Sequence, residues 1–201
     1  VNVTWEMTFK CNLKCVHCLS DSGIPNKEEF GRDDCFRLID QLTDLKVFQV
    51  NIGGGEPFIR DDFMDILSYA HQKGLVTCVS TNGTFIDTDI ARRLAKLKML
   101  YLQVSLDGVN AEVNDQIRGK GTYKRILEAI SCLASNKVPF SINTVLTRLN
   151  YPQLDPLRDL AKEYGAELRV SRFRPSGRGK YNRDALTPDK DQLEAFAEWL
   201  G

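Results

Sequence analysis

Three cysteines lie close together near the start of the chain, in the stretch CNLKCVHC. Cys11, Cys15 and Cys18 have the spacing C-x3-C-x2-C, which suits a loop wrapped around a metal centre. A structural zinc site takes four protein ligands, whereas a catalytic zinc ion or an iron-sulfur cluster can keep one position for a small molecule. His17 could complete a zinc site, although adjacent residues such as His17 and Cys18 rarely both reach one tetrahedral ion. The three thiols therefore indicate either an iron-sulfur cluster with one open iron or a zinc site.

A glycine-rich stretch, NIGGGEP, stands at the end of a predicted strand over residues 46–52. Gly53, Gly54 and Gly55 expose backbone carbonyls and amides without side-chain obstruction, and Glu56 adds an acceptor. Such a loop can hold a protonated amine, and a simple tight bend is the alternative. The stretch lacks the Lys-Ser/Thr pair of a phosphate-binding loop and does not open a G-x-G-x-x-G helix.

Strand-like and helix-like patterns alternate along the whole chain. The strands and helices that they predict must position the cysteines and the glycine-rich stretch. Predicted strands cover residues 1–9, 46–52, 75–80, 99–107, 140–147 and 166–173. Predicted helices alternate with them, over 33–46, from a cap at Asp61 to Gly74, from Asp87, from Thr122, from 154 to Gly165, and from the Thr187-Pro188 pair. Successive β-α units of this kind form a parallel sheet, either doubly wound or closed towards a barrel.

The stretch 99–107 helps to choose between these folds. Leu100, Leu102, Val104 and Leu106 share one face, and Tyr101, Gln103, Ser105 and Asp107 share the other. A closed eight-stranded barrel fills its interior with branched apolar side chains. The polar face therefore favours an α/β fold of the partial (β/α)6, TIM-like open-barrel type with a roomy cavity. An ordinary sheet with one solvated edge is the alternative.

The composition describes an ordinary globular domain with no net charge. The 201 residues are 42% hydrophobic, and Lys+Arg equal Asp+Glu at 27 each, so no nucleic-acid partner is indicated. No apolar run approaches the ~20 residues that span a bilayer, and the N-terminus has no signal-peptide pattern. We expect a cytoplasmic protein without a membrane partner. Cys35, Cys78 and Cys132 lie in apolar patterns and are expected to be buried.

Taken together, CNLKCVHC, GGGEP, STNG and SLDG, each after a successive predicted strand, resemble the radical S-adenosylmethionine (SAM) superfamily. The stretches VSLDGVNAEVNDQIRGKG and RFRPSGRG resemble the mycofactocin maturases within its peptide-modifying (SPASM) branch. The resemblance implies that Cys11, Cys15 and Cys18 hold a 4Fe-4S cluster. Its fourth iron is then chelated by the amino and carboxylate groups of SAM, and the missing fourth thiol marks that vacancy.

The resemblance also implies a set of cofactor-binding residues. Gly53, Gly54, Gly55 and Glu56 are expected to bind the SAM amine. The residues expected near the ribose and the carboxylate are Ser80, Asn82, Ser105, Asp107 and Arg118. Those expected near the adenine are His17, Val145, Leu146 and Arg172. Arg118 could instead be a solvated loop charge, and Ser80, Asn82 and Asp107 could only shape turns. No side chain is assigned as the catalytic group or as a general base, because the cofactor carries the reaction.

The implied activity is reductive cleavage of SAM to a 5′-deoxyadenosyl radical and modification of a ribosomal precursor peptide. The specific expectation is oxidative decarboxylation and carbon-carbon crosslinking of a C-terminal Val-Tyr in mycofactocin biosynthesis. Alternatives are another radical SAM peptide or protein maturase, of the sulfatase or quinone-cofactor type, and a non-catalytic zinc-binding interaction module. Implied partners are the peptide, a small peptide-carrier protein and an electron donor. The basic strip 172–180 could attract a peptide carboxylate or be a solvated loop.

The implied domain organisation is a single radical SAM core over residues 1–201. Members of the branch continue into a cysteine-rich domain that holds auxiliary clusters, but no cysteine follows Cys132 here. The chain begins at Val1 without methionine and ends in a helical pattern. We therefore expect a core barrel from which the auxiliary-cluster domain is absent, as a piece of a longer enzyme.

Overall fold

Six parallel strands form one sheet whose order follows the chain, from β1 at one end to β6 at the other. The computed structural model describes residues 2–24, 29–98 and 100–200; Val1 and Met99, which the predicted strands include, lie outside them. The strands are β1 (Asn2–Thr8), β2 (Gln49–Gly54), β3 (Val76–Thr81), β4 (Leu100–Ser105), β5 (Phe140–Leu146) and β6 (Glu167–Arg172). The sheet is not closed, which confirms the predicted open α/β barrel.

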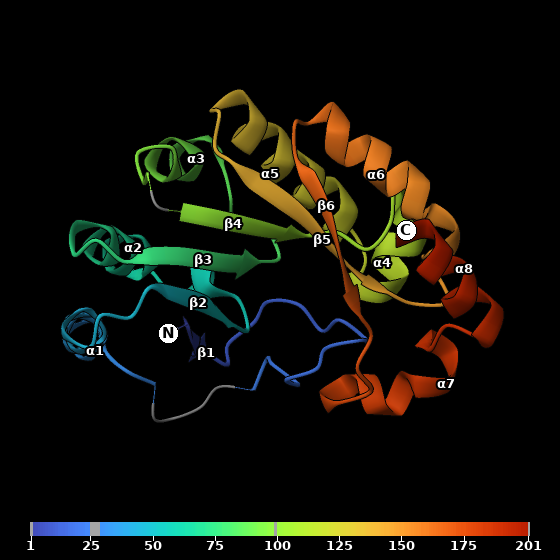
Figure 1. Cartoon of the computed structure of the whole chain (residues 1–201), viewed down its shortest axis with the longest axis horizontal. Coiled ribbons are helices and arrows are strands. Elements are labelled where there is room, and N and C mark those ends of the chain that lie inside the picture. The colour runs from blue at the N-terminus through green and yellow to red at the C-terminus, as the bar shows by residue number, and fades with distance from the viewer. Residues whose placement is uncertain (1, 25–28, 99, 201) are drawn as a thin grey trace.

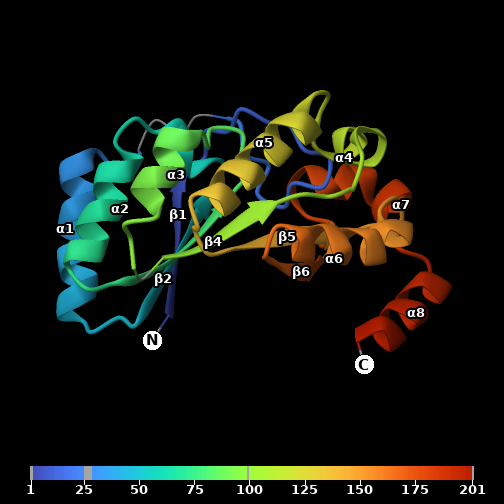
Figure 2. The same ribbon diagram turned by 90° about the horizontal axis from the view of Figure 1, so that it is seen from above.

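Most helices lie outside the curved sheet. The α-helices are α1 (Arg32–Asp44), α2 (Phe63–Gln72), α3 (Thr88–Leu94), α4 (Ala111–Arg118), α5 (Thr122–Ser135), α6 (Leu154–Glu163), α7 (Arg183–Leu186) and α8 (Lys190–Leu200), and the 3-10 turns are η1 (Pro57–Ile59), η2 (Tyr151–Gln153) and η3 (Gly177–Asn182). Figure 1 shows α1, α2, α3, α5 and α6 along an arc around the strands, and Figure 2 shows α1, α2, α3 and α5 on one side of the sheet. None of the described helices has the length and apolar character needed to cross a membrane.

The core fills the space between the sheet and these helices. From β4, Leu102 and Val104 are buried, and they belong to one apolar cluster with Ile126 and Ile130 of α5. On the opposite face of β4, Tyr101 is 62% exposed. The two faces therefore differ as the alternation in 99–107 predicts, and the polar face is left for the interior of the open barrel.

Helix starts follow the prediction at one place and shift by a residue at another. The Asp87 carboxylate accepts a hydrogen bond from the Ile90 amide at 2.8 Å and caps α3, as predicted. Helix α2 is preceded by Asp62, not by the predicted cap Asp61. The Asp62 carboxylate binds the Arg60 guanidinium at 2.8 and 2.9 Å instead of capping the helix.

Two further predicted caps are wrong because a neighbouring residue takes the position. Gly121, with φ +81°, precedes α5, and the Thr122 hydroxyl instead donates to the Gly119 carbonyl at 2.8 Å. Before α8, the Asp189 carboxylate accepts from the Gln192 amide at 2.9 Å, so the helix begins after Asp189 and not at the Thr187-Pro188 pair.

Helix α4 is absent from the sequence prediction and matters most for the site. Asn110 caps it by accepting from the Val113 amide at 3.0 Å, and Gly119, with φ +114°, ends it. The last residue of α4 is Arg118. Arg118 is buried there, so the alternative that it is a solvated loop charge is wrong.

The three remaining cysteines fit the expectation only in part. Cys35 is fully buried in the core. Cys78 and Cys132 are only partly buried. All three are free thiols.

Candidate functional site

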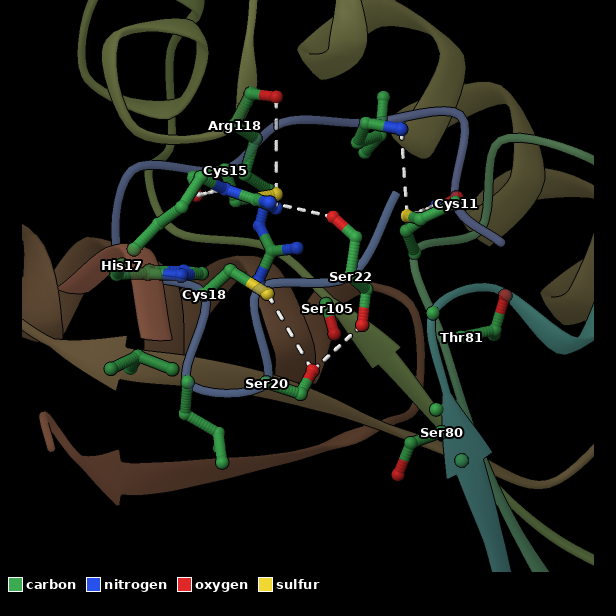
Figure 3. A pocket seen from close by; sticks show the side chains of 18 of the residues that line it. Cys11, Cys15, His17, Cys18, Ser20, Ser22, Ser80, Thr81, Ser105 and Arg118 are labelled. Atoms are coloured by element: carbon green, nitrogen blue, oxygen red, sulfur yellow. Dashed lines mark hydrogen bonds between the residues drawn. The ribbon is translucent and has the colours of Figure 1, made fainter. Parts of the chain in front are cut away.

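The cysteine loop follows β1 and places all three thiols at one cavity. Cys11, Cys15 and Cys18 line a cavity of about 210 Å³, here called the cysteine cavity. Figure 3 shows the three sulfur-bearing side chains with Ser80 and Ser105, which lie at the carboxyl ends of β3 and β4. Parallel α/β folds place their sites at these strand ends.

Most of the predicted residues meet at this cavity, and four do not. Besides the cysteines, its lining includes His17, Gly53, Gly54, Gly55, Ser80, Asn82, Ser105, Arg118 and Val145. Glu56 and Asp107 lie behind the wall, and Leu146 and Arg172 line neighbouring hollows. Residues that sequence reasoning missed also contribute, namely Leu13, Leu19, Ser20, Ser22, Thr81, Asn143 and Arg178.

Glycines at the end of β2 allow the cysteine loop to pass close by. The Gly55 amide donates to the Thr8 carbonyl at 2.7 Å, and the Glu56 amide donates to the Lys10 carbonyl at 2.9 Å. A Cβ on Gly54 would collide with the Thr8 carbonyl, and one on Gly55 with the Lys10 carbonyl. The Gly54 backbone also has φ +122°, which glycine adopts readily. These glycines bring exposed backbone groups to the wall beside Cys11.

The three thiols have different surroundings. Burial raises the pKa of Cys15 to about 11, against the opposing charge of Arg118. Burial also raises the pKa of Cys11. Burial acts in the same direction at Cys18, but hydrogen bonds from Ser22 and Ser20 outweigh it and lower the Cys18 pKa. Metal ligation needs thiolates, so buried neutral thiols suit a centre whose own positive charge stabilises their ionised form.

Asp107 is a fully buried anion that holds two wall residues in place. Its Oδ2 lies 2.6 Å from His17 Nε2 and 2.7 Å from Arg118 Nε. Its Oδ1 accepts from the Val145 amide at 2.8 Å. Burial disfavours the carboxylate, but the charge of Arg118 and the adjacent His17 side chain outweigh that effect and hold the pKa of Asp107 well below its usual range. Asp107 therefore acts on the cavity through His17, Arg118 and Val145.

Glu56 is likewise turned away from the cavity. Its side chain accepts from the Phe58 amide at 3.1 Å, the Thr81 hydroxyl at 2.8 Å and the Asn82 amide at 2.6 Å. Burial raises the pKa of Glu56 to about 7, although these hydrogen bonds oppose the rise. The side chain joins the end of β2 to the end of β3, which leaves the glycine backbone as the part of GGGEP that faces the cavity.

The STNG stretch joins the cysteine loop through side-chain amides. Asn82 Nδ2 donates to Asn12 Oδ1 at 2.9 Å, and Asn12 Nδ2 donates to the Thr84 hydroxyl at 2.8 Å. Asn82 Nδ2 also lies 3.9 Å from Cys11 Sγ. Asn82 thus shapes the loop and lines the cavity at the same time.

A strap formed by η3 covers the back of the cysteine loop. Arg178 Nε donates to the Cys15 carbonyl at 3.1 Å, and Nη1 donates to the Ser22 carbonyl at 2.6 Å and pairs with Asp21 at 2.8 Å. The Asn182 side chain donates to the Val16 carbonyl at 3.1 Å. The interpretation of 172–180 as a solvated or peptide-attracting strip is therefore wrong for Arg178. Figure 1 shows the blue loop after β1 reaching towards the orange-red segment before α7.

The zinc interpretation requires donors that converge on a single ion. Among the residues that the structure describes, no group of three or more His, Cys, Asp and Glu side chains is close enough for that. A cubane cluster binds each thiolate through a different iron, so its ligands surround a volume and do not meet at a point. Three thiols along the wall of a cavity fit the second arrangement.

Comparisons with known proteins find a family model, curated relatives and solved structures that this chain resembles. The radical SAM superfamily model matches residues 5–161. The mycofactocin maturases MftC of Mycolicibacterium smegmatis and Mycobacterium tuberculosis are 44% and 45% identical over 199 residues, which is 98% of this chain and 51% of each of theirs. The chain thus spans about half the length of these curated relatives. The structure of Streptococcus suis SuiB bound to S-adenosylmethionine has a TM-score of 0.82 at 23% identity, over 99% of this chain and 46% of that one, and shows the same fold.

Proposed function

The chain belongs to the radical SAM superfamily, and from that premise we propose that it is the core of a peptide maturase. One observation carries the proposal more than any other. Three free thiols and a run of glycine backbone line the same cavity at the carboxyl ends of parallel strands. Residues 1–201 would form the radical SAM core domain of that enzyme.

Radical SAM enzymes use a 4Fe-4S cluster and SAM, and the cysteine cavity offers groups that fit both. Cys11, Cys15 and Cys18 would hold three irons, since thiolates are the usual protein ligands of such clusters. When bound, the cluster and SAM supply a 5′-deoxyadenosyl radical that takes hydrogen from carbon. The protein then has to bind, orient and shield the cofactor.

The surrounding residues divide these tasks. The backbone of Gly53, Gly54 and Gly55 would accept from the SAM amine, because these glycines line the cavity and have no side chains of their own. The Arg118 guanidinium would face the SAM carboxylate while Asp107 fixes it from behind at 2.7 Å. Ser80, Asn82 and Ser105 would line the ribose, and His17 and Val145 the adenine. Leu146 and Arg172 stay predictions for the outer edge of the adenine site, because neither lines this cavity.

The substrate that best fits the relatives is a ribosomal precursor peptide. The MftC relatives are named mycofactocin maturases. For this chain we propose oxidative decarboxylation of a C-terminal tyrosine and its carbon-carbon joining to the preceding valine. A small carrier protein would present the peptide, and an electron donor would reduce the cluster. The cytoplasm suits this chemistry, because it keeps the three thiols reduced.

Anaerobic reconstitution with iron and sulfide tests the proposal. The loaded protein is expected to bind iron and sulfide in equal amounts. With a chemical reductant added to reduce the cluster, it is expected to release 5′-deoxyadenosine from SAM and to change the mass of a peptide ending in Val-Tyr. A protein that cleaves SAM and leaves this peptide unchanged while modifying another would support a different radical SAM maturase. A colourless protein that holds one zinc ion and no sulfide would contradict the enzyme and support a zinc-binding module.

A further inference from the structure

Two serines that follow the third cysteine lie in a row beside its sulfur. Ser20 Oγ lies 3.7 Å from Cys18 Sγ, and Ser22 Oγ lies 2.7 Å from Ser20 Oγ. The backbone of both serines also hydrogen bonds to the Cys18 sulfur. Figure 3 shows the dashed lines that join the three side chains. Ser20 and Ser22, here called the serine row, both line the cysteine cavity.

The number of hydrogens available fixes the direction of the serine row when a metal centre is bound. A cysteine that ligates a metal is a thiolate and has no hydrogen to donate, so Ser20 has to be the donor to Cys18 Sγ. Each hydroxyl carries one hydrogen, which leaves Ser22 as the donor in the bond between the two serines. Hydrogen bonds in such a chain polarise one another, so Ser22 strengthens the bond from Ser20 to the sulfur.

Contacts on both sides hold the serine row in place. Ser22 is buried, and its carbonyl accepts from Arg178 Nη1 at 2.6 Å. Asp21, between the two serines, has φ +53° and pairs with Arg178 at 2.8 Å. This left-handed conformation is uncommon outside glycine, although Asp adopts it more often than most residues. The Gly179 amide donates to the Cys18 carbonyl at 3.3 Å, so the strap formed by η3 also fixes the turn that carries the serines.

The other two cavity cysteines have different neighbours. Cys11 Sγ accepts from the Leu13 amide at 3.4 Å, and Cys15 Sγ lies 3.9 Å from the Arg118 carbonyl, which can only accept. In the part of the chain that the structure describes, no hydroxyl hydrogen bonds to either of these sulfurs. Among the described contacts of the three cavity thiols, hydroxyl donation therefore belongs to Cys18.

Building on the proposed function, in which Cys18 holds one iron of the cluster, we propose that the serine row raises the reduction potential of that cluster. Reduction adds one electron from the electron donor and no proton, and no bond to either serine forms or breaks. The added negative charge is shared by the cysteine sulfurs, and the Ser20 hydroxyl stabilises it at Cys18. Hydrogen bonds to the sulfurs are among the factors that set the potentials of iron-sulfur clusters. Ser20 and Ser22 are thus positioning residues that act through Cys18.

The test is a redox titration of the anaerobically reconstituted protein, followed by electron paramagnetic resonance in the absence of SAM. Ser20→Ala is expected to weaken reduction by about three- to tenfold, which lowers the midpoint potential by about 28–59 mV for a one-electron couple. Ser22→Ala should lower the potential by less, because Ser20 keeps its own bond to the sulfur. Ser20→Thr retains a hydroxyl and should keep the wild-type potential.

Ser135→Ala is the matched control, because Ser135 is an exposed serine at the end of α5 that does not line the cysteine cavity. It should keep the wild-type potential. Iron and sulfide are measured in every protein, so that only fully loaded proteins are compared. A fully loaded Ser20→Ala protein with the wild-type potential overturns the inference, and so does a Ser20→Thr protein with the potential of Ser20→Ala. If Ser20→Ala takes up less iron, a fully loaded Ser22→Ala protein with the wild-type potential overturns it.

Activity gives a second measurement of the same effect. With a weak reductant, Ser20→Ala should release less 5′-deoxyadenosine from SAM than the wild type does, and a stronger reductant should restore the yield. A yield that stays low with the stronger reductant overturns the inference, because a lost contact with SAM would then explain it.

The outcomes separate this inference from the proposed function. A wild-type protein that binds no iron and sulfide contradicts the proposed function, and the inference fails with it. Fully loaded alanine variants that titrate as the wild type does overturn only the inference, and the maturase proposal stands.

Discussion

Among single residues, Cys15 is the thiol that depends most on a bound metal centre. It is the buried member of the three, and burial raises its pKa to about 11. In Cys15→Ala, two of the three cavity thiols remain, and we expect both the iron content after reconstitution and the yield of 5′-deoxyadenosine to fall to background. Iron analysis and chromatography of the SAM products measure the two quantities.

Cys132→Ala serves as the matched control for that prediction, because Cys132 is a partly buried thiol that does not line the cysteine cavity. It should bind iron as the wild type does. A Cys15→Ala protein with wild-type iron and sulfide would contradict the assignment of the cluster to these thiols.

The second prediction about a single residue concerns Asp107. Asp107→Asn removes the anion that lies 2.7 Å from Arg118 and leaves a guanidinium buried without its counter-charge. Breaking a buried ion pair in this way costs about 3–5 kcal/mol. We expect the free energy of unfolding in urea at pH 7 to fall by about that amount. In the control Asp89→Asn, which removes an exposed carboxylate beside Arg92, stability should change little. Equal stability of the two variants would show that Asp107 does not hold the wall.

At the scale of elements, Glu56 joins the ends of β2 and β3 and gives that junction a pH dependence. Burial raises its pKa from an ordinary value of 4.5 to about 7, so between these values the folded chain keeps a proton that the unfolded chain releases. Stability from this group is therefore full below pH 4.5, falls as the pH rises towards 7, and is constant above it. The slope is at most about 1.4 kcal/mol per pH unit.

Glu56→Gln fixes the side chain in a neutral form and should remove that slope. Urea unfolding of the wild type and the variant between pH 4.5 and 7 measures it. Glu112→Gln, an exposed substitution in α4, should keep the wild-type slope. A wild type and a Glu56→Gln variant with parallel pH curves would contradict a proton held on Glu56.

The strap formed by η3 supplies another prediction about elements. Arg178→Ala removes hydrogen bonds to the Cys15 and Ser22 carbonyls and the ion pair with Asp21. We expect the metal-free variant to expose its cysteine loop, so that thiol reagents modify Cys15 and Cys18 several-fold faster, and to take up less iron. Arg178→Lys should recover only part of the effect, because an amine cannot reproduce the planar fork. Arg92→Ala removes an exposed arginine and should leave thiol reactivity unchanged.

For the whole molecule, periodicity in the sequence predicted the order of strands and helices because each element buries one apolar face. The alternation of Leu102 and Val104 with Gln103 and Ser105 also predicted which face of β4 would line the barrel. Spacing predicted the cysteine cluster, since Cys11, Cys15 and Cys18 lie within one loop. These features depend on residues that are close together in sequence, so short sequence patterns can predict them.

Features that depend on distant contacts could not be predicted in this way. Glu56 and Asp107 turn away from the cavity because Thr81, Asn82, His17 and Arg118 bind them, and those partners are distant in sequence. Arg178 binds backbone carbonyls more than 150 residues earlier, for which no side-chain pattern exists. The caps of α5 and α8 were missed because Gly121 and Asp189 compete with adjacent residues that are equally good candidates.

The most direct test of the central claim is the electron paramagnetic resonance spectrum of the reduced, reconstituted protein, recorded with and without SAM. The account predicts the signal of one 4Fe-4S cluster per chain that changes shape when SAM is added, because the iron without a cysteine ligand takes up the amine and carboxylate. A spectrum that shows no such cluster, or one that SAM leaves unaltered, would contradict the account.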